Sequence, residues 1–383
     1  MNQTFELFNA RFVNGDRVVQ AREMACMTQV ELARLVGVTQ PMIAHIEKGL
    51  KQPSMDLAEA IARETAMTMD FLCLPSTAAL PEGSLFRAKQ SVSAKKLLQA
   101  HSIAERAFEM FLKLSSHFHL PATKLRSVTG SPEDVAKSAR KMLGLSPDKP
   151  IPYLIRAFEK AGGVVIPFPE LEGREAFAVW AGDRPIVAIG PTKNGDRLRF
   201  SVAHEIGHLL MHQTPTAKAK AEVDANVFAA ELHMPTEAIR TDLDQPLSVK
   251  RLGQLKLKWG VSMASLLFRA KDLGLISRRA HERLIIEMAP YRTNEPEDYS
   301  IPLEKPRMLR QMIENFYGDH TDCEALAKEF CLPPAFVRGV LDRYASSAET
   351  ASRSSKVVSI GSRLQKRTDA RLAGSRLGLH GTV

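Results

Sequence analysis

The chain has 383 residues, of which 44% are hydrophobic and 25% are charged, and its formal net charge is +9. This length exceeds what one hydrophobic core covers, so we expect two or three globular domains, and the basic balance is compatible with a polyanionic partner such as DNA. The sequence has no run of eighteen apolar residues and no basic start followed by an apolar stretch, which excludes a membrane-spanning helix and a secretion signal.

The first 72 residues are predicted to form short amphipathic helices that include a helix-turn-helix. Thr28 can cap the first helix of this motif, Gly37 supplies a left-handed turn, and Thr39 can cap the second helix. Five apolar residues are expected to form the shared seam: Leu32, Leu35, Val38, Ile43 and Ile46. The alternative is an ordinary helical hairpin that binds no nucleic acid.

The second helix of the motif would enter the major groove of DNA by its N-terminal end. Gln40 is the best base reader, because its amide can pair with the N6 and N7 atoms of adenine. Met42 can contact a thymine methyl group, and His45 can reach a base edge or a phosphate. The other residues expected at the DNA are Gln29, Thr39, Lys48 and Lys51, with Gln29 and the two lysines on phosphates.

This segment resembles the XRE (Cro/CI-like) family of helix-turn-helix proteins from about Val13 to Phe71. The resemblance implies an all-α, lambda-repressor-like domain. It also implies a homodimer that binds a palindromic operator of double-stranded DNA.

Helical patterns continue after a boundary rich in Pro and Gly at residues 74–83. A long helix is predicted from Val92 to about His119, and Ser131 is expected to cap another. The pattern then changes to short apolar runs that predict a small β-sheet. A helix is expected at 151–160, and strands are expected at 164–166, 176–180 and 186–189. We find no internal repeat.

A His-Glu-x-x-His motif occurs inside a helix predicted from Arg197 to His212. His204 and His208 are four residues apart, so they lie on one helix face and can hold one metal ion together. Glu205 lies between them, where it can act as a general base toward an attacking water molecule. Zinc suits two imidazoles and one carboxylate, with the fourth position left for water. The alternative is a buried polar helix face that binds no metal.

The third ligand is expected downstream of the motif. Met211 and Thr214 stand where a metzincin would have Gly and His, which excludes the three-histidine site. Glu222 fits best because it opens the next predicted helix, and Asp224 and Glu231 are its rivals.

Two more polar side chains are expected near this centre. Asn226 lies one helical turn beyond Glu222, where it can orient a ligating histidine through a hydrogen bond. His212 continues the row of histidines, but a third ligand from the same helix would sit poorly around one metal ion. We therefore expect His212 to be structural, or to hold a ligating histidine from behind.

The stretch Arg197–His212, followed by Glu222-x-x-Ala-Asn-x-Phe-Ala-Ala-Glu-Leu-x-Met-Pro, resembles the ImmA/IrrE family of zinc metallo-endopeptidases. The strand region and the linker residues Phe86–Ala88 fit this family too, in the arrangement where an XRE domain precedes the peptidase. One departure is His233, where the family usually has Leu.

The resemblance implies a zincin-like domain in which His204, His208 and Glu222 bind Zn²⁺ and Glu205 is the catalytic base. It also implies that the substrate is a repressor-type DNA-binding protein. Peptide substrates of such folds commonly lie along a sheet edge in extended form, so one of the predicted short strands is expected to receive the substrate.

The C-terminal third is predicted to be helical to about Ala345. Ser248–Ile276 is interpreted as two helices with a tight turn, either a second DNA-reading unit or, as we favour, a helical lid on the peptidase. Two further helices are expected between Glu314 and Tyr344. The Arg-rich tail that follows is expected to be disordered.

The predicted fold class is mainly α with a small β-sheet (α+β). The expected domains are a helix-turn-helix domain (1–75), a helical linker region (76–145), a zinc metallopeptidase domain (146–245), a helical C-terminal region (246–345) and the tail (346–383).

The sequence thus predicts a cytoplasmic transcriptional regulator that carries a zinc endopeptidase domain and cleaves a repressor. The alternative is a transcription factor or an antitoxin-like regulator whose peptidase-like domain is a non-catalytic sensor or dimerisation module. The four cysteines are scattered and form no Cys-x-x-Cys pair, which indicates reduced thiols in the cytoplasm.

Overall fold

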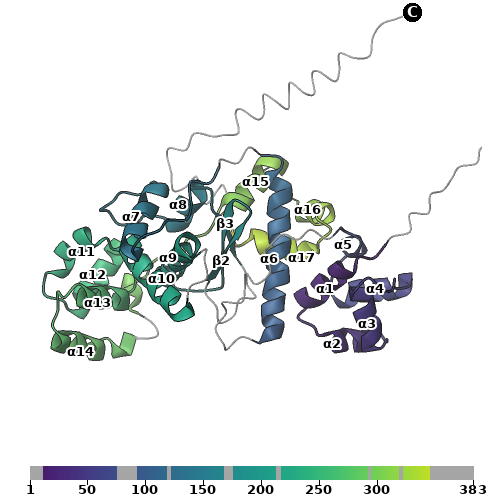
Figure 1. Cartoon of the computed structure of the whole chain (residues 1–383), viewed down its shortest axis with the longest axis horizontal. Coiled ribbons are helices and arrows are strands. Elements are labelled where there is room, and N and C mark those ends of the chain that lie inside the picture. The colour runs from purple at the N-terminus through teal and green to yellow at the C-terminus, as the bar shows by residue number, and fades with distance from the viewer. Residues whose placement is uncertain are drawn as a thin grey trace, which may run out of the picture.

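The computed structural model describes residues 12–75, 93–118, 122–167, 176–212, 217–291, 295–318 and 322–345. It is mainly helical with one three-stranded sheet, which confirms the predicted α+β fold. Figure 1 shows an elongated arrangement, with helices α1–α5 at one end, α11–α14 at the other, and α6 and the sheet between them. No helix in these described ranges is long and apolar enough to cross a membrane. The tail and the Phe86–Ala88 stretch lie outside the described residues.

Five helices form the N-terminal unit: α1 (Gly15–Met24), α2 (Gln29–Leu35), α3 (Gln40–Glu47), α4 (Met55–Glu64) and α5 (Met69–Leu72). The predicted cap of α2 is confirmed, because the Thr28 hydroxyl accepts from the Glu31 N–H while the Glu31 carboxylate accepts from the Thr28 N–H. Gly37 has a φ of +72°, the left-handed conformation expected at the turn.

Two predictions about this unit are wrong. Thr39 precedes α3, but its hydroxyl makes no capping hydrogen bond. Of the two N–H groups that a cap can satisfy, Pro41 lacks one, and the Met42 N–H donates to the Thr39 carbonyl instead. Leu35, expected in the apolar seam, is 45% exposed. It lies about 60° around the helix from buried Leu32, on the side away from buried Ala33, and is therefore at the margin of the face that α2 buries.

Helix α6 (Ala94–Ser115) packs along α1 and stands between the N-terminal unit and the sheet. Arg17 of α1 donates to the carboxylate of Glu109 of α6 at 3.0 Å, and both side chains are buried. The region predicted as a helical linker contributes to two different hydrophobic clusters. Helix α6 belongs to the cluster of the N-terminal unit, whereas α7 (Pro132–Met142) belongs to the cluster around α9 and α10.

The sheet contains β1 (Val164–Pro167), β2 (Ala176–Ala181) and β3 (Arg184–Ile189), and α8 (Leu154–Lys160) precedes it. Strand β3 is central, because it pairs in parallel with β1 and antiparallel with β2. Strand β2 is therefore an edge of the described sheet. It packs on α9 (Gly195–Met211), where the Trp180 indole N–H donates to the Leu209 carbonyl at 3.0 Å.

Helix α9 packs against α10 (Lys218–His233), and the pair forms the centre of the second hydrophobic cluster. Gly207 of α9 lies so close to Phe228 of α10 that a Cβ atom here would be 2.8 Å from the ring. A larger residue would therefore push the two helices apart.

Four helices beyond α10 form a third cluster: α11 (Thr236–Leu243), α12 (Val249–Trp259), α13 (Met263–Asp272) and α14 (Arg278–Glu287). Short 3-10 helices follow at Ala289–Tyr291 and Glu297–Tyr299. The predicted pair of helices within 248–276 corresponds to α12 and α13, with the turn at Gly260 in the left-handed conformation. This cluster packs on α10, where Arg269 of α13 forms a buried ion pair with Glu231.

The chain continues in α15 (Met308–Tyr317), α16 (Cys323–Glu329) and α17 (Pro334–Leu341), and the last two lie within Glu314–Tyr344, where two helices were predicted. Helices α16 and α17 form a second motif of two short helices that resembles α2 and α3 in length. Helices α2 and α16 both have seven residues, and α3 and α17 both have eight. The turn of the second motif again has one residue in the left-handed conformation, Cys331, with a φ of +54°.

The hydrogen bonds of the two turns also correspond. Val38 donates its N–H to the Ala33 carbonyl at 2.9 Å, and Leu332 donates its N–H to the Ala327 carbonyl at 2.8 Å. The same hydrogen bond also ends other helices, as between the Met67 N–H and the Ala62 carbonyl at 2.8 Å, so the second motif is a pair of short helices joined by a turn of a common type. The residue types that mark the first motif, Thr and Gly, are replaced by Asp, Cys and Pro in the second.

The second motif and the residues after it contact both the N-terminal unit and the sheet. Its turn carbonyls at Phe330 and Cys331 accept hydrogen bonds from Arg106 of α6 and from the Thr68 hydroxyl before α5. After α17, the Tyr344 hydroxyl donates to the Val165 carbonyl of β1 at 3.0 Å. Helices α15–α17 therefore join the N-terminal unit to the sheet.

Candidate metal centre and DNA-binding surface

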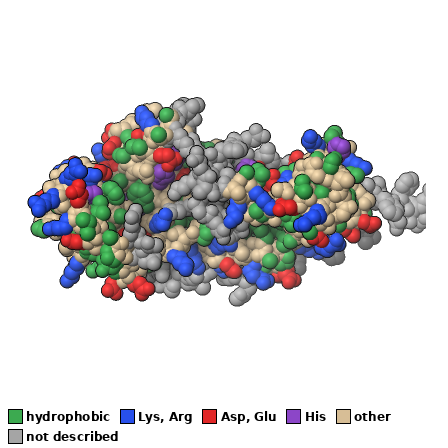
Figure 2. Space-filling model, turned by 90° about the horizontal axis from the view of Figure 1, so that it is seen from below, with side chains coloured by type: hydrophobic (Ala, Val, Ile, Leu, Met, Phe, Trp, Pro, Cys, Tyr) green, Lys and Arg blue, Asp and Glu red, His purple; other side chains and the backbone are tan. Residues whose placement is uncertain are grey.

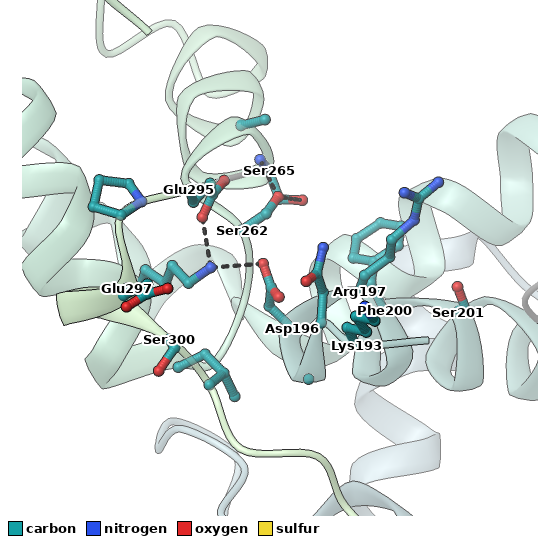
Figure 3. Close-up of a pocket in the computed structure, with 16 residues that line it drawn as sticks. Lys193, Asp196, Arg197, Phe200, Ser201, Ser262, Ser265, Glu295, Glu297 and Ser300 are labelled. Atoms are coloured by element: carbon teal, nitrogen blue, oxygen red, sulfur yellow. Dashed lines mark hydrogen bonds and ion pairs between the residues drawn. The ribbon is translucent and has the colours of Figure 1, made fainter. Parts of the chain in front are cut away.

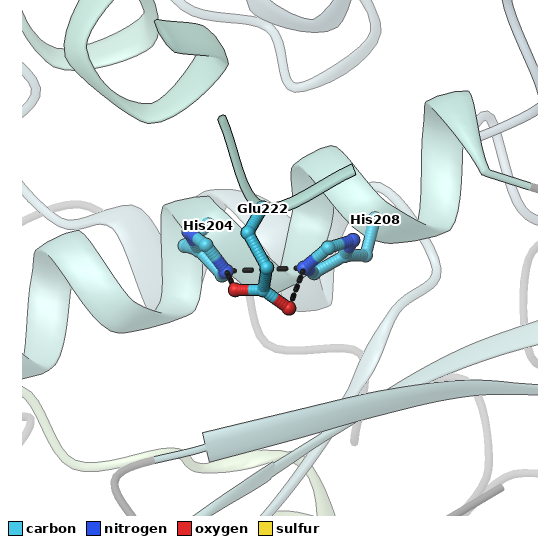
Figure 4. Close-up of side chains that lie close together, drawn as sticks. All are labelled: His204, His208 and Glu222. Atoms are coloured by element: carbon cyan, nitrogen blue, oxygen red, sulfur yellow. Dashed lines mark hydrogen bonds and ion pairs between the residues drawn. The ribbon is translucent and has the colours of Figure 1, made fainter. Parts of the chain in front are cut away.

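Helices α9 and α10 bring three metal-binding side chains together (Figure 4). His204 and His208 project from α9, and Glu222 projects from α10. The two histidine Nε2 atoms lie 3.0 Å apart. The Glu222 carboxylate oxygens lie 3.4 Å from His204 Nε2 and 3.7 Å from His208 Nε2. The three residues selected from the sequence as metal ligands thus converge on one point.

These separations fit the coordination shell of a zinc ion. Two atoms bound to a tetrahedral zinc ion at roughly 2.1 Å lie about 3.4 Å apart. The observed separations of 3.0, 3.4 and 3.7 Å lie on both sides of that value. Two imidazole nitrogens and one carboxylate are also the donor set of many catalytic zinc sites, which keep a fourth position open.

A second polar side chain holds each of the two histidines. Asn226 Oδ1 lies 3.0 Å from His204 Nδ1, so this ring donates its Nδ1–H and leaves Nε2 unprotonated toward the centre. His212 Nδ1 lies 2.9 Å from His208 Nδ1, and His212 Nε2 lies 3.9 Å from Asp224. A chain of polar groups therefore runs outward from His208. Asp224 was expected as a rival metal ligand, but its carboxylate instead lies behind His212.

The other rival ligand has structural partners. The buried Glu231 carboxylate pairs with Arg269 and accepts from the Thr236 N–H at 3.0 Å. His233 is fully buried, and its Nε2 lies 3.1 Å from the Arg199 carbonyl. Burial lowers the pKa of His233 to about 3, so this ring is neutral. Both residues hold helices together.

Glu205 follows His204 on α9, is half-buried, and is not one of the three groups that converge. Burial lowers the pKa of the His204 imidazole below its ordinary value. The neutral ring, which has the lone pair that a metal needs, is therefore favoured near pH 7.

The residues predicted to contact DNA lie on α2, on α3 and just outside α3. The exposed members are Thr39, His45, Lys48 and Lys51, and the half-buried members are Gln29, Gln40 and Met42. On the face seen in Figure 2, Lys and Arg side chains are spread over both ends of the molecule, so the positive charge is not gathered in one patch there.

A line of hydrogen bonds fixes the predicted base reader. The Gln40 amide donates to Gln29 Oε1 at 2.7 Å, and the Gln29 amide donates to the Glu47 carboxylate at 2.6 Å. Glu47 is buried and pairs with Arg22 at 2.5 Å. Arg22 and Glu47 were not predicted from the sequence, because only their burial and pairing in the structure mark them as supports of the motif.

Comparisons with known families agree with the two sites. Residues 18–72 match the helix-turn-helix family model, and residues 158–271 match the peptidase family described as the IrrE N-terminal-like domain. The second match contains His204, Glu205, His208 and Glu222. No curated protein matches the chain.

Proposed function

Because a helix-turn-helix domain precedes an IrrE N-terminal-like peptidase domain in this chain, we propose that the protein is a DNA-binding transcriptional regulator and that its second domain is a zinc-dependent endopeptidase. Its proposed substrate is a repressor-type protein. The observation that carries the proposal is the convergence of His204, His208 and Glu222, whose ligand atoms all lie within 4.8 Å of one another.

Each residue of the centre has a proposed task. His204, His208 and Glu222 would hold a zinc ion, which when bound supplies Lewis acidity and acidifies a water molecule. Asn226 and His212 would keep the two imidazole rings in place. Glu205 would accept a proton from the attacking water and pass it to the leaving nitrogen of the cleaved peptide bond.

We propose that the substrate binds in extended form along β2 (Ala176–Ala181). An edge strand has N–H and C=O groups that can pair with an added strand. Strand β2 is an edge of the described sheet and packs on α9, the helix that provides the two histidines.

Zinc content tests the centre directly. The purified full-length protein is expected to hold about one zinc ion per chain, and Glu222→Ala is expected to lose most of it, because one of three protein ligands is removed. Glu237→Ala is the matched control, since Glu237 is exposed on α11. Plasma mass spectrometry gives the metal per chain. A metal-free parent after incubation with zinc would reject the peptidase proposal and leave a regulator with a non-catalytic domain.

The helix-turn-helix domain, the DNA reader of this chain, is proposed to bind a palindromic operator as part of a homodimer in the cytoplasm. Gln40→Ala is expected to weaken binding to the operator by about 1–3 kcal/mol, because the amide that pairs with adenine is lost. The operator can be selected from random duplexes and the affinity measured by fluorescence anisotropy. Gln311→Ala, at an exposed position of α15, is the control. An unchanged site preference in Gln40→Ala would exclude Gln40 as a base reader.

A further inference from the structure

A cavity of about 660 Å³ lies beside the metal centre, between α9, α10 and α13. Asn226, which holds His204, lines this cavity, and so does Phe200, one helical turn before His204. The cavity therefore begins next to the candidate metal ligands and extends along α10 away from Glu222.

The walls of this inner cavity are largely apolar. Val227 and Ala230 line it from α10, Met234 lines it directly after that helix, and the rings of Phe200 and Phe268 line it from α9 and α13. The Phe268 side chain is 53% exposed. An aromatic ring left exposed at the edge of a cavity offers surface that a bound apolar group would cover.

The one cation in the wall is neutralised. Arg269 pairs with the Glu231 carboxylate, and its guanidinium also donates to the Met234 carbonyl at 3.0 Å and the Thr236 hydroxyl at 2.9 Å. Among the described side chains that line the cavity, Arg269 is the only Lys or Arg. The inner cavity therefore has no unpaired positive charge to select an anionic ligand, and its polar lining residues besides Arg269 are Glu133, Asn226, Thr236, Ser265 and Asp272. Its remaining walls are apolar and offer surface to an apolar group.

A second cavity of about 730 Å³ adjoins the first, because Phe200 and Ser265 line both. Figure 3 shows it between Arg197 and Phe200 on one side and Ser262 and Ser265 on the other. Its lining is polar and charged, and within it Lys256 donates to Asp196 at 2.9 Å and to Glu295 at 2.5 Å. The two cavities form a groove that is apolar near the metal centre and polar farther out.

We propose that the inner cavity receives a large apolar side chain, of the size of Leu, Met or Phe, from a polypeptide bound at the metal centre. This inference rests on the proposed function and deepens it, since it names the residue class that the site selects. A polypeptide fits both parts of the groove, because its side chain is apolar while its backbone needs polar partners. The volume of about 660 Å³ lies within the roughly 300–1,000 Å³ of pockets that enclose a whole small-molecule ligand, so the cavity has room for a large side chain together with part of the bound backbone.

The test measures binding separately from cleavage. Zinc-loaded full-length protein carrying Glu205→Gln, which blocks the proposed base, is incubated with a peptide library randomised at several positions. The bound peptides are identified by mass spectrometry. We expect enrichment of Leu, Met and Phe at one position of the bound peptides. Capture without an apolar preference at any position would overturn the inference.

Filling the cavity is expected to remove this preference. Ala230→Phe, added to Glu205→Gln, should reduce the enrichment of Leu, Met and Phe about 10-fold or more, because a pocket distinguishes side chains by the space left for them. Peptides with Gly or Ala at that position should bind as before. The same substitution at Ala335, which is exposed on α17, is the matched control and should change nothing.

A second variant covers the case in which Ala230→Phe does not fold, as judged by circular dichroism. Phe268→Ala widens the cavity from its exposed edge and should shift the preference toward larger side chains. An unchanged profile in this variant would overturn the inference.

The inference and the proposed function can fail separately. Cleavage by the parent protein without any apolar preference would remove the inference and leave the peptidase. Selective capture of apolar peptides by a parent that cleaves none of them would remove the peptidase and leave the binding site.

Discussion

Replacing Glu205 by Gln is expected to lower the rate of peptide-bond cleavage by about 10²–10⁴-fold, the usual contribution of a general base. The amide has almost the same shape as the carboxylate but cannot accept the proton of the attacking water. Zinc should stay at about one ion per chain, because Glu205 is not among the three converging side chains. The measurement is the appearance of new N-termini in a cell protein extract, followed by mass spectrometry, beside zinc analysis of the same sample.

The matched control is Glu237→Gln, an exposed Glu on α11, which should cleave at the parental rate. The cleavage rate and the zinc content of Glu205→Gln together decide whether Glu205 is the general base. Cleavage at the parental rate by Glu205→Gln would give the base role to another residue. Loss of both cleavage and zinc would instead mean that Glu205 supports the metal centre.

Glu47→Ala is expected to destabilise the N-terminal unit by about 3–5 kcal/mol, the cost of removing one partner of a buried ion pair. The Glu47 carboxylate accepts from Arg22 Nε at 2.5 Å and from Arg22 Nη2 at 3.3 Å. Without it the Arg22 guanidinium stays buried, with the Met27 carbonyl at 2.9 Å and the Glu23 carboxylate at 3.8 Å as its partners. Differential scanning calorimetry of the full-length protein should show a transition at lower temperature.

DNA binding should fall in the same variant, even at a temperature where the protein is folded. Glu47 holds the Gln29 amide, and Gln29 holds Gln40. Glu64→Ala is the control, because Glu64 pairs with Arg63, whose side chain is 71% exposed, and exposed pairs contribute little. A Glu47→Ala protein with parental stability would show that Arg22 finds other partners in solution.

The N-terminal motif was predictable because its signals are local. Thr28 caps within three residues, and Gly37 adopts the left-handed turn, so each signal sits next to its effect in the sequence. Thr39 failed as a cap for a reason that is also local. The proline two residues later removes one donor, and backbone hydrogen bonding uses the next.

The metal centre was only partly predictable. The spacing of His204 and His208 fixes their common face on one helix, whatever the rest of the chain does. The choice of Glu222 over Glu231 depends on how α10 crosses α9 and α13, which no spacing within α10 reveals. The crossing brings Glu222 to the histidines and Glu231 to Arg269.

The cavity beside the metal centre could not be predicted from the sequence either, because it also depends on how the helices cross. It lies between helices whose lining residues run from Glu133 to Leu273, far apart along the chain. The turn between α16 and α17 was not predicted because it uses Cys331, a residue type that rarely adopts the left-handed conformation.

The contacts of α15–α17 limit how such a protein can evolve. Thr68 before α5 donates to the Cys331 carbonyl, so the DNA reader is docked on helices encoded more than 250 codons downstream of it. Recombination that exchanged only the N-terminal segment would separate the helix-turn-helix domain from the helices α15–α17 that it contacts. New operator preferences are therefore expected to arise by point substitution on the exposed face of α3, rather than by exchange of whole domains between genes.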